Sequence, residues 1–150
     1  MSKLRGAVAA GAAVGLALSG AAAWAGTADG QGAQKSGLSP TAGSMSSQCN
    51  PGSGANTNGF SILNAPGKVG AVNKINGEVS LKRATPNTTY VVNPADSSNN
   101  CRPVAMLTTN NVGNGNAHIN VTPGMAGTYY VVLQDGMMNE VFASAPKPLQ

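Results

Sequence analysis

Side chains that carry acid–base or metal chemistry are scarce in this sequence. Its 150 residues include one histidine, five acidic residues and two cysteines. It has no histidine cluster that could hold a metal, no G-x-S-x-G nucleophile turn and no glycine loop followed by Lys-Ser or Lys-Thr. We therefore expect a protein without catalytic residues, without a metal site and without a cofactor.

A secreted hydrolase is the enzymatic alternative, and it would have to be built on His118 with Asp96 or Asp135 as its partner. Apolar residues alternate with polar ones across residues 117–121, which places His118 on the outward face of a strand. This pattern favours a solvated strand histidine over a catalytic one.

Basic residues outnumber acidic ones by nine to five, which gives a formal net charge of +4 at pH 7. Loss of Lys3 and Arg5 with an N-terminal leader lowers the charge to 7 − 5 = +2. Of the remaining basic residues only Lys82 and Arg83 are adjacent, so no basic stripe is present to follow a phosphate backbone. We expect no nucleic-acid partner.

The first 25 residues are typical of a cleavable secretory signal peptide. Lys3 and Arg5 precede a run of small and apolar residues from 6 to 23, and Ala23 and Ala25 stand where a signal peptidase reads small residues. A retained membrane anchor is the alternative, but the run is mainly alanine and glycine. We expect cleavage after Ala25 and no membrane association afterwards. The composition of the leader favours a bacterial source.

Residues 26–48 consist almost entirely of small and polar residues, with Leu38 and Met45 as the large apolar exceptions. Such a segment buries too little apolar surface to offset the entropy of ordering it. The composition predicts a flexible Gly/Ser-rich linker over 26–48, followed by one folded domain over 49–150.

Cys49 and Cys101 are the two cysteines of an exported chain, and a disulfide between them is the simplest pairing. The bridge would close a loop of 101 − 49 = 52 residues, which loop entropy values at about 4 kcal/mol. Two free thiols acting in catalysis or metal binding are the alternative, but the close Cys-x-x-Cys spacing of such sites is missing.

Short β-branched and aromatic runs alternate with turn residues from residue 60 onward. This pattern predicts an all-β protein, an antiparallel sandwich of about seven to eight strands. The expected strands are 60–63, 68–73, 78–82, 88–93, 102–108, 116–122, 128–134 and 140–143. Alternation predicts that the inward residues are Val79, Leu81, Ala117, Ile119 and Val121, and that the outward ones are Glu78, Lys82, His118 and Asn120.

Pro86, Thr88 and Tyr90 form a P-x-T-x-Y motif that resembles the corner of immunoglobulin-like and fibronectin type III sandwiches. The resemblance implies that the Tyr90 hydroxyl bonds back to the upstream backbone. Three further expected strands follow Tyr90, an order more similar to small secreted actinobacterial immunoglobulin-like domains, such as the apoproteins of enediyne chromoproteins. That family has four cysteines and this chain has two, so no ligand-binding residue is carried over.

Two segments are candidate contact surfaces. Residues 129–133 are apolar on both strand faces, which suits a central strand or one whose outer face, with Tyr130 and Val132, is covered by the tail or by a partner. Met137 and Met138 could form an adaptable contact patch, although core packing at a strand end is the interpretation that we favour.

The polar loop 96–100 offers side-chain oxygens to a calcium ion but lacks the spaced carboxylates of a dedicated site. A turn that hydrogen-bonds its own backbone is the better interpretation.

These observations predict a protein that is secreted or associated with the cell wall. Its function is expected to be that of a non-catalytic β-sandwich that binds an extracellular or envelope partner or serves as a structural component, with self-association as one version. A small-molecule carrier resembling the chromoprotein apoproteins is the alternative from a different class.

Overall fold

The computed structural model describes residues 32–43, 49–64, 67–69, 72–122, 124 and 126–150. The expected signal peptide and residues 26–31 and 44–48 of the expected linker lie outside these ranges. The described part of the chain contains strands and turns, and it holds no helix that could span a bilayer.

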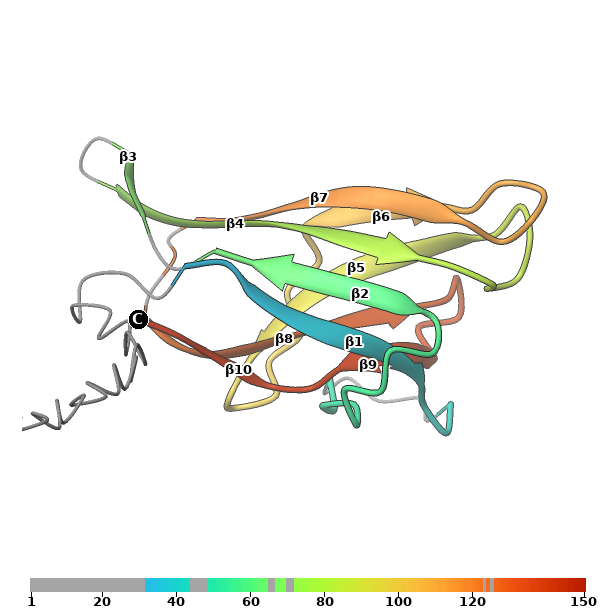
Figure 1. Cartoon of the computed structure of the whole chain (residues 1–150), viewed down its shortest axis with the longest axis horizontal. Coiled ribbons are helices and arrows are strands. Elements are labelled where there is room, and N and C mark those ends of the chain that lie inside the picture. Colours follow the sequence, from blue (N-terminus) through green and yellow to red (C-terminus); the bar gives the residue numbers. More distant parts are fainter. Residues whose placement is uncertain (1–31, 44–48, 65–66, 70–71, 123, 125) are drawn as a thin grey trace, which may run out of the picture.

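Ten antiparallel strands are described (Figure 1). This confirms the all-β prediction, and the number of strands is higher than the seven to eight that the sequence predicted. Their bounds are β1 (Gln34–Pro40), β2 (Gly59–Leu63), β3 (Gly67–Val69), β4 (Val72–Leu81), β5 (Thr89–Asp96), β6 (Ala105–Thr108), β7 (Gly115–Val121), β8 (Gly127–Gln134), β9 (Glu140–Ser144) and β10 (Lys147–Leu149).

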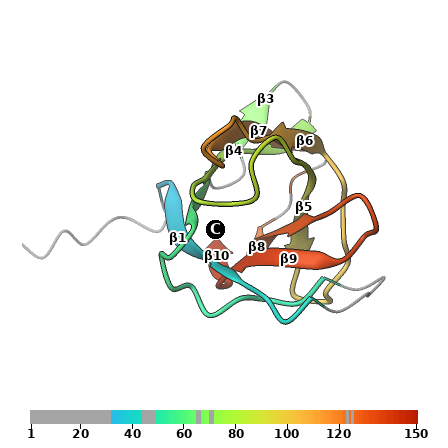
Figure 2. The ribbon, with the colours of Figure 1, turned by 90° about the vertical axis from the view of Figure 1, so that its right-hand side faces the viewer.

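The strands curl into a nearly closed barrel (Figure 2). One sheet has the order β7-β4-β2-β1 and the other the order β1-β9-β8-β5-β6, so β1 belongs to both. β3 pairs with the first residues of β4, and β10 pairs with the first residues of β8. β6 and β7 lie next to each other on the remaining side, and no ladder joins them among the described residues.

The prediction of a flexible linker over 26–48 is wrong for residues 34–40, because these residues form β1. The first half of β1 pairs with β2, where Gly37 is opposite Phe60, and the second half pairs with β9, where Leu38 is opposite Ser144. Leu38 is 0 % exposed. Composition misled here because β1 draws its stability from strands that lie far along the chain, and one large apolar residue is enough to anchor it.

The predicted strand 68–73 is also two strands. β3 ends at Val69 and β4 begins at Val72, and these two valines are opposite each other in an antiparallel pair. Residues 70 and 71, which separate them, lie outside the described ranges.

One hydrophobic core fills the barrel, and the alternation in the sequence predicts its lining correctly. Val79, Leu81 and Ile119 are at most 2 % exposed, whereas Glu78 and His118 point outward as expected. The main cluster of buried side chains is Leu38, Leu63, Ile75, Val79, Leu81, Tyr90, Val92, Leu107, Ala117, Ile119, Val121, Val131, Leu133, Phe142 and Leu149.

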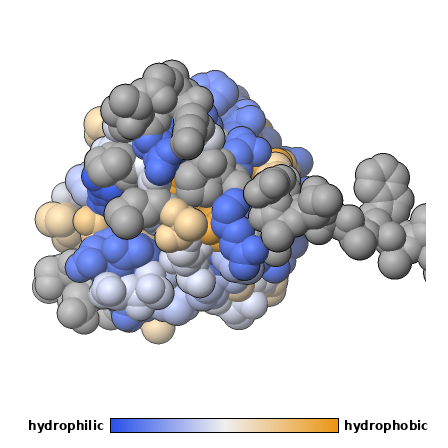
Figure 3. All heavy atoms as spheres, turned by 90° about the vertical axis from the view of Figure 1, so that its left-hand side faces the viewer, coloured by the Kyte–Doolittle hydropathy of each residue, from blue (hydrophilic) through white to orange (hydrophobic). Residues whose placement is uncertain are grey.

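The outside of the barrel is mostly polar. Figure 3 views one end of the molecule, where hydrophilic residues dominate the described surface and hydrophobic ones form small patches between them.

We expect Leu38→Ala to lower the free energy of unfolding by about 2–5 kcal/mol, because it removes a fully buried side chain from the core. Equilibrium unfolding in urea measures this. Met106→Ala, which removes a large apolar side chain that is 70 % exposed on β6, is the control and should change stability by less than about 1 kcal/mol. A Leu38→Ala protein as stable as the wild type would restore the linker interpretation.

Candidate functional site

A basic cleft of about 250 Å³ opens on the outer face of the β1-β2-β4 sheet. Its lining comes from two neighbouring strands, the segment before β2 and the residues directly after β4: Lys35, Asn56, Gly59, Phe60, Lys82 and Arg83. We call this hollow the basic cleft.

Strand register brings Lys35 and Phe60 together. Gly37 of β1 is opposite Phe60 of β2, so Lys35, two residues earlier on the same strand, extends diagonally toward the ring. The Nζ atom of Lys35 lies 4.0 Å from the ring centroid, which is a cation–π contact. This contact holds a long flexible side chain at the edge of the cleft.

Lys82 and Arg83 reach the cleft because β2 also pairs with β4. Gly59 is opposite Leu81, and the Lys82 amide donates to the Asn58 carbonyl at 2.9 Å. The chain therefore leaves β4 alongside the segment that leads into β2, and both basic residues end beside Phe60.

Arg83 is held in a fixed direction. Its φ of 55° lies in the left-handed region, which is costly for a residue with a side chain. The backbone N–H donates to Asn114 Oδ1 at 3.3 Å, and Nη2 donates to the Thr57 carbonyl at 3.0 Å. A guanidinium has five N–H donors, so most of them are left for a ligand.

No acidic residue lines the basic cleft, whereas three of the six basic side chains that the structure describes do. Two ammonium groups, a guanidinium and an aromatic face together suit a ligand that carries an anionic group beside an apolar or ring-shaped part. The sequence showed the Lys82–Arg83 pair, but Lys35 lay in the expected linker, so no local signal could have found this cluster.

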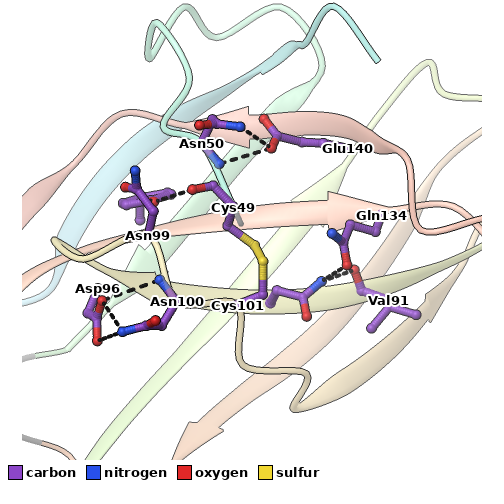
Figure 4. Close-up of a disulfide and its surroundings, with 11 residues drawn as sticks. Cys49, Asn50, Val91, Asp96, Asn99, Asn100, Cys101, Gln134 and Glu140 are labelled. Carbon is purple, nitrogen blue, oxygen red and sulfur yellow. Dashed lines mark hydrogen bonds between the residues drawn. A yellow bond between two sulfur atoms is a disulfide. The ribbon is translucent and has the colours of Figure 1, made fainter. Parts of the chain in front are cut away.

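The predicted disulfide between Cys49 and Cys101 is present, with the two Cα atoms 5.2 Å apart (Figure 4). It ties the start of residues 49–53, which we call the cover segment, to Cys101, which follows the loop after Asp96 and forms an isolated bridge with Ala95 of β5. The Cys49 amide also donates to the Asn99 carbonyl at 3.0 Å. A second, smaller core forms under the cover segment from Cys49, Ala95, Tyr130, Val132 and Ala143.

Tyr130 and Val132 on the outer face of β8 are therefore covered by the chain itself, one of the alternatives expected for residues 129–133, and they do not form a contact surface for a partner. They are 2 % and 0 % exposed, because the chain's own cover segment packs on the outer face of β8. The Tyr130 hydroxyl lies 2.8 Å from the Cys49 carbonyl oxygen and 2.7 Å from Asn99 Oδ1. It carries one proton and donates to one of these two acceptors at a time.

Burial is the main cause that raises the pKa of the Tyr130 phenol from 10.0 to about 12, and the negative charges of Glu140 and Asp96 contribute to this rise. At neutral pH the hydroxyl is thus a stable hydrogen-bond donor to the cover segment.

Met137 and Met138 are exposed, at 76 % and 64 %, so the core-packing interpretation is wrong for both. They sit in a turn that Asp135 organises: its Oδ1 atom accepts the amides of Met137 and Asn139, each at 2.9 Å. The side-chain hydrogen bond from Asn139 is the main reason that the pKa of Asp135 lies below its usual value.

The corner motif keeps part of its expected geometry. Thr88 Oγ1 donates to the Pro86 carbonyl at 3.0 Å. The Tyr90 ring is buried and meets Phe142 edge-on, with centroids 5.8 Å apart. Within the described ranges its hydroxyl makes no hydrogen bond to upstream backbone, and the tyrosine that does bond to a distant backbone carbonyl is Tyr130.

His118, Asp96 and Asp135, the residues of the hydrolase alternative, each have separate partners in the structure. His118 is exposed on β7 opposite Glu78. Burial alone would raise the pKa of Asp96, but hydrogen bonds from the Ser98 amide at 2.9 Å and from Asn100 outweigh it and hold that pKa below its usual value. The loop 96–100 is thus a turn that hydrogen-bonds its own backbone, and no group of three metal-ligating residues occurs in the described part of the chain.

Comparison of the chain with protein-family models, with curated proteins and with solved structures finds no match.

We expect one phenolate step near pH 12 that Tyr130→Phe removes. Because the folded pKa is above that of the unfolded chain, Tyr130 contributes stability below pH 10 that is lost as the pH rises toward 12. Phenolate absorbance measures the first effect and alkaline unfolding the second. Tyr129→Phe, on the same strand, is the control. Loss of the late step in Tyr129→Phe instead would contradict the assignment.

Proposed function

We propose that the protein is an exported, non-catalytic binding protein that holds an anionic group in the basic cleft. The observation that carries this proposal is the convergence of Lys35, Lys82 and Arg83 on one hollow that has no acidic residue among its described lining. These residues come from positions 35 and 82–83 of the chain, and strand pairing brings them to one hollow that Phe60 also lines.

The size of the cleft bears on what it can hold. At about 250 Å³ it lies below the range typical for drug-sized ligands, so it suits one charged group together with a small ring or chain. Exposed cations bind weakly in high salt because counterions screen them. We therefore expect binding that depends on ionic strength and that gains from repeated anionic groups on one ligand.

Export is supported by the leader-like residues 1–25 and by the disulfide, which suits an oxidising compartment. A location in the medium or in the cell wall would place the basic cleft next to anionic polymers or small anions of the surroundings. Both destinations remain part of the proposal.

The carrier alternative has less support. Side chains of the main core fill the interior of the barrel, and three surface hollows measure about 250, 290 and 370 Å³.

An immunoglobulin-like sandwich stays a proposal for the fold. The corner motif and the two antiparallel sheets support it, and the missing hydrogen bond from the Tyr90 hydroxyl to upstream backbone within the described ranges weighs against it.

A titration with inorganic phosphate, followed through the backbone amides of Asn56 and Gly59, tests the function. We expect saturable shifts in the wild type and at least about tenfold weaker binding in Lys82→Gln/Arg83→Gln, since each charge-assisted hydrogen bond contributes about 1.5–3 kcal/mol. Lys74→Gln/Lys147→Gln removes the same charge at positions that do not line the cleft and should bind like the wild type.

Equal weakening in both double variants would reduce the effect to net charge and contradict the proposal. So would the absence of saturable binding to phosphate and sulfate alike.

A further inference from the structure

A second hollow, with a carboxylate in place of cations, lies between β1, the cover segment and the start of β9. Glu140 is only 2 % exposed and lines this hollow. Its Oε2 atom accepts the Asn50 amide at 2.9 Å and Asn50 Nδ2 at 3.4 Å (Figure 4). Within the described ranges these are the hydrogen bonds that the carboxylate accepts, and both come from one neutral residue.

A carboxylate that is withdrawn from water normally has a cation as its partner, because an uncompensated buried charge is costly. Among the residues that the structure describes, no lysine, arginine or histidine lines the hollow. The segment 44–48, which connects β1 with Cys49 in sequence, contains no basic residue either. The negative charge of Glu140 therefore has no counterion from the chain among the residues described, and it faces a space that could receive one.

The hollow measures about 370 Å³ and has both polar and apolar walls. Ser39 Oγ and Ser53 Oγ lie 3.0 Å apart on it, and Thr41 Oγ1 donates to the Glu140 carbonyl at 2.7 Å. Pro40 and Pro51 supply apolar surface.

These features fit an organic cation better than a metal ion. Calcium takes six to eight oxygen ligands, usually from several carboxylates, and Glu140 is the one carboxylate here. A volume of about 370 Å³ is also far larger than an ion needs, whereas the proline surfaces could contact a carbon stem that carries a charged head.

We propose that this hollow binds a primary alkylammonium group, of the kind carried by a lysine side chain, with Glu140 as its counterion and hydroxyl oxygens around it. The site is separate from the basic cleft, and its ligand has the opposite charge, so either site can fail without the other. In this proposal the buried charge of Glu140 contributes to ligand binding and not to the stability of the fold.

The purified chain titrated with n-butylammonium chloride tests this proposal, with the Asn50 amide as the reporter. We expect a saturable shift in the wild type and at least about tenfold weaker binding in Glu140→Gln, which keeps an acceptor oxygen for Asn50 but loses the charge. Glu78→Gln, an exposed carboxylate on β4 with the same change of charge, should bind like the wild type. Without ligand, Glu140→Gln should unfold at the same urea concentration as the wild type or at a higher one.

Two further probes need no variant. n-Butanol, which has the same stem without the charge, should give no saturable shift, and butyltrimethylammonium, which has the charge but no N–H donor, should bind at least about tenfold more weakly. Equal responses to butanol and butylammonium would overturn the proposal, as would a response to calcium chloride with none to butylammonium. A Glu140→Gln protein that is less stable but binds butylammonium as before would make Glu140 a purely structural residue.

Discussion

The structure depends on the division of β1 between two partners. The first half of this strand completes a ladder with β2, and the second half completes one with β9, so a single run of seven residues joins the two sheets. Leu38 anchors it in the core, and two buried serines of the strand form hydrogen bonds to neighbouring segments. Ser36 Oγ donates to the carbonyl of Ala145, directly after β9, at 3.0 Å, and Ser39 Oγ lies 3.0 Å from Ser53 Oγ of the cover segment. Without β1 the two sheets would each expose an apolar face and an unpaired edge.

Both candidate sites inherit their geometry from this strand and from the chain that follows Cys49. β1 contributes Lys35 to the basic cleft and Ser39 to the hollow at Glu140, and residues 50–59 line both. The two segments touch directly: a Cβ atom on Gly37 would collide with the Gly54 carbonyl oxygen, so a residue without a side chain is required there. At the other end of this segment, the disulfide joins Cys49 to Cys101, and the Tyr130 hydroxyl joins the Cys49 carbonyl to β8. Strand pairing, cross-link and buried hydrogen bond thus act together on one stretch of backbone.

The sequence predicted what depends on local pattern. Alternation identified Val79, Leu81 and Ile119 as core residues, and the cysteine count identified the disulfide. It failed where stability comes from distant partners. β1 has the composition of a linker, and Lys35 meets Phe60 only through the register of two strands. The apolar run 129–133 indicated that the outer face of β8 is covered, but nothing local shows that the cover segment packs on Tyr130, and Glu140 gave no signal because its burial depends on the same segment.

Amide hydrogen exchange of β1 is the most direct measurement of this account. If β1 is an integral strand, the amides of residues 34–39 that bond to β2 and β9 exchange only through global unfolding, as slowly as those in the centre of β8. If those amides exchange at the rate of an unfolded chain while β8 remains protected, then β1 is not part of the folded barrel, and both candidate sites lose the strand that builds them.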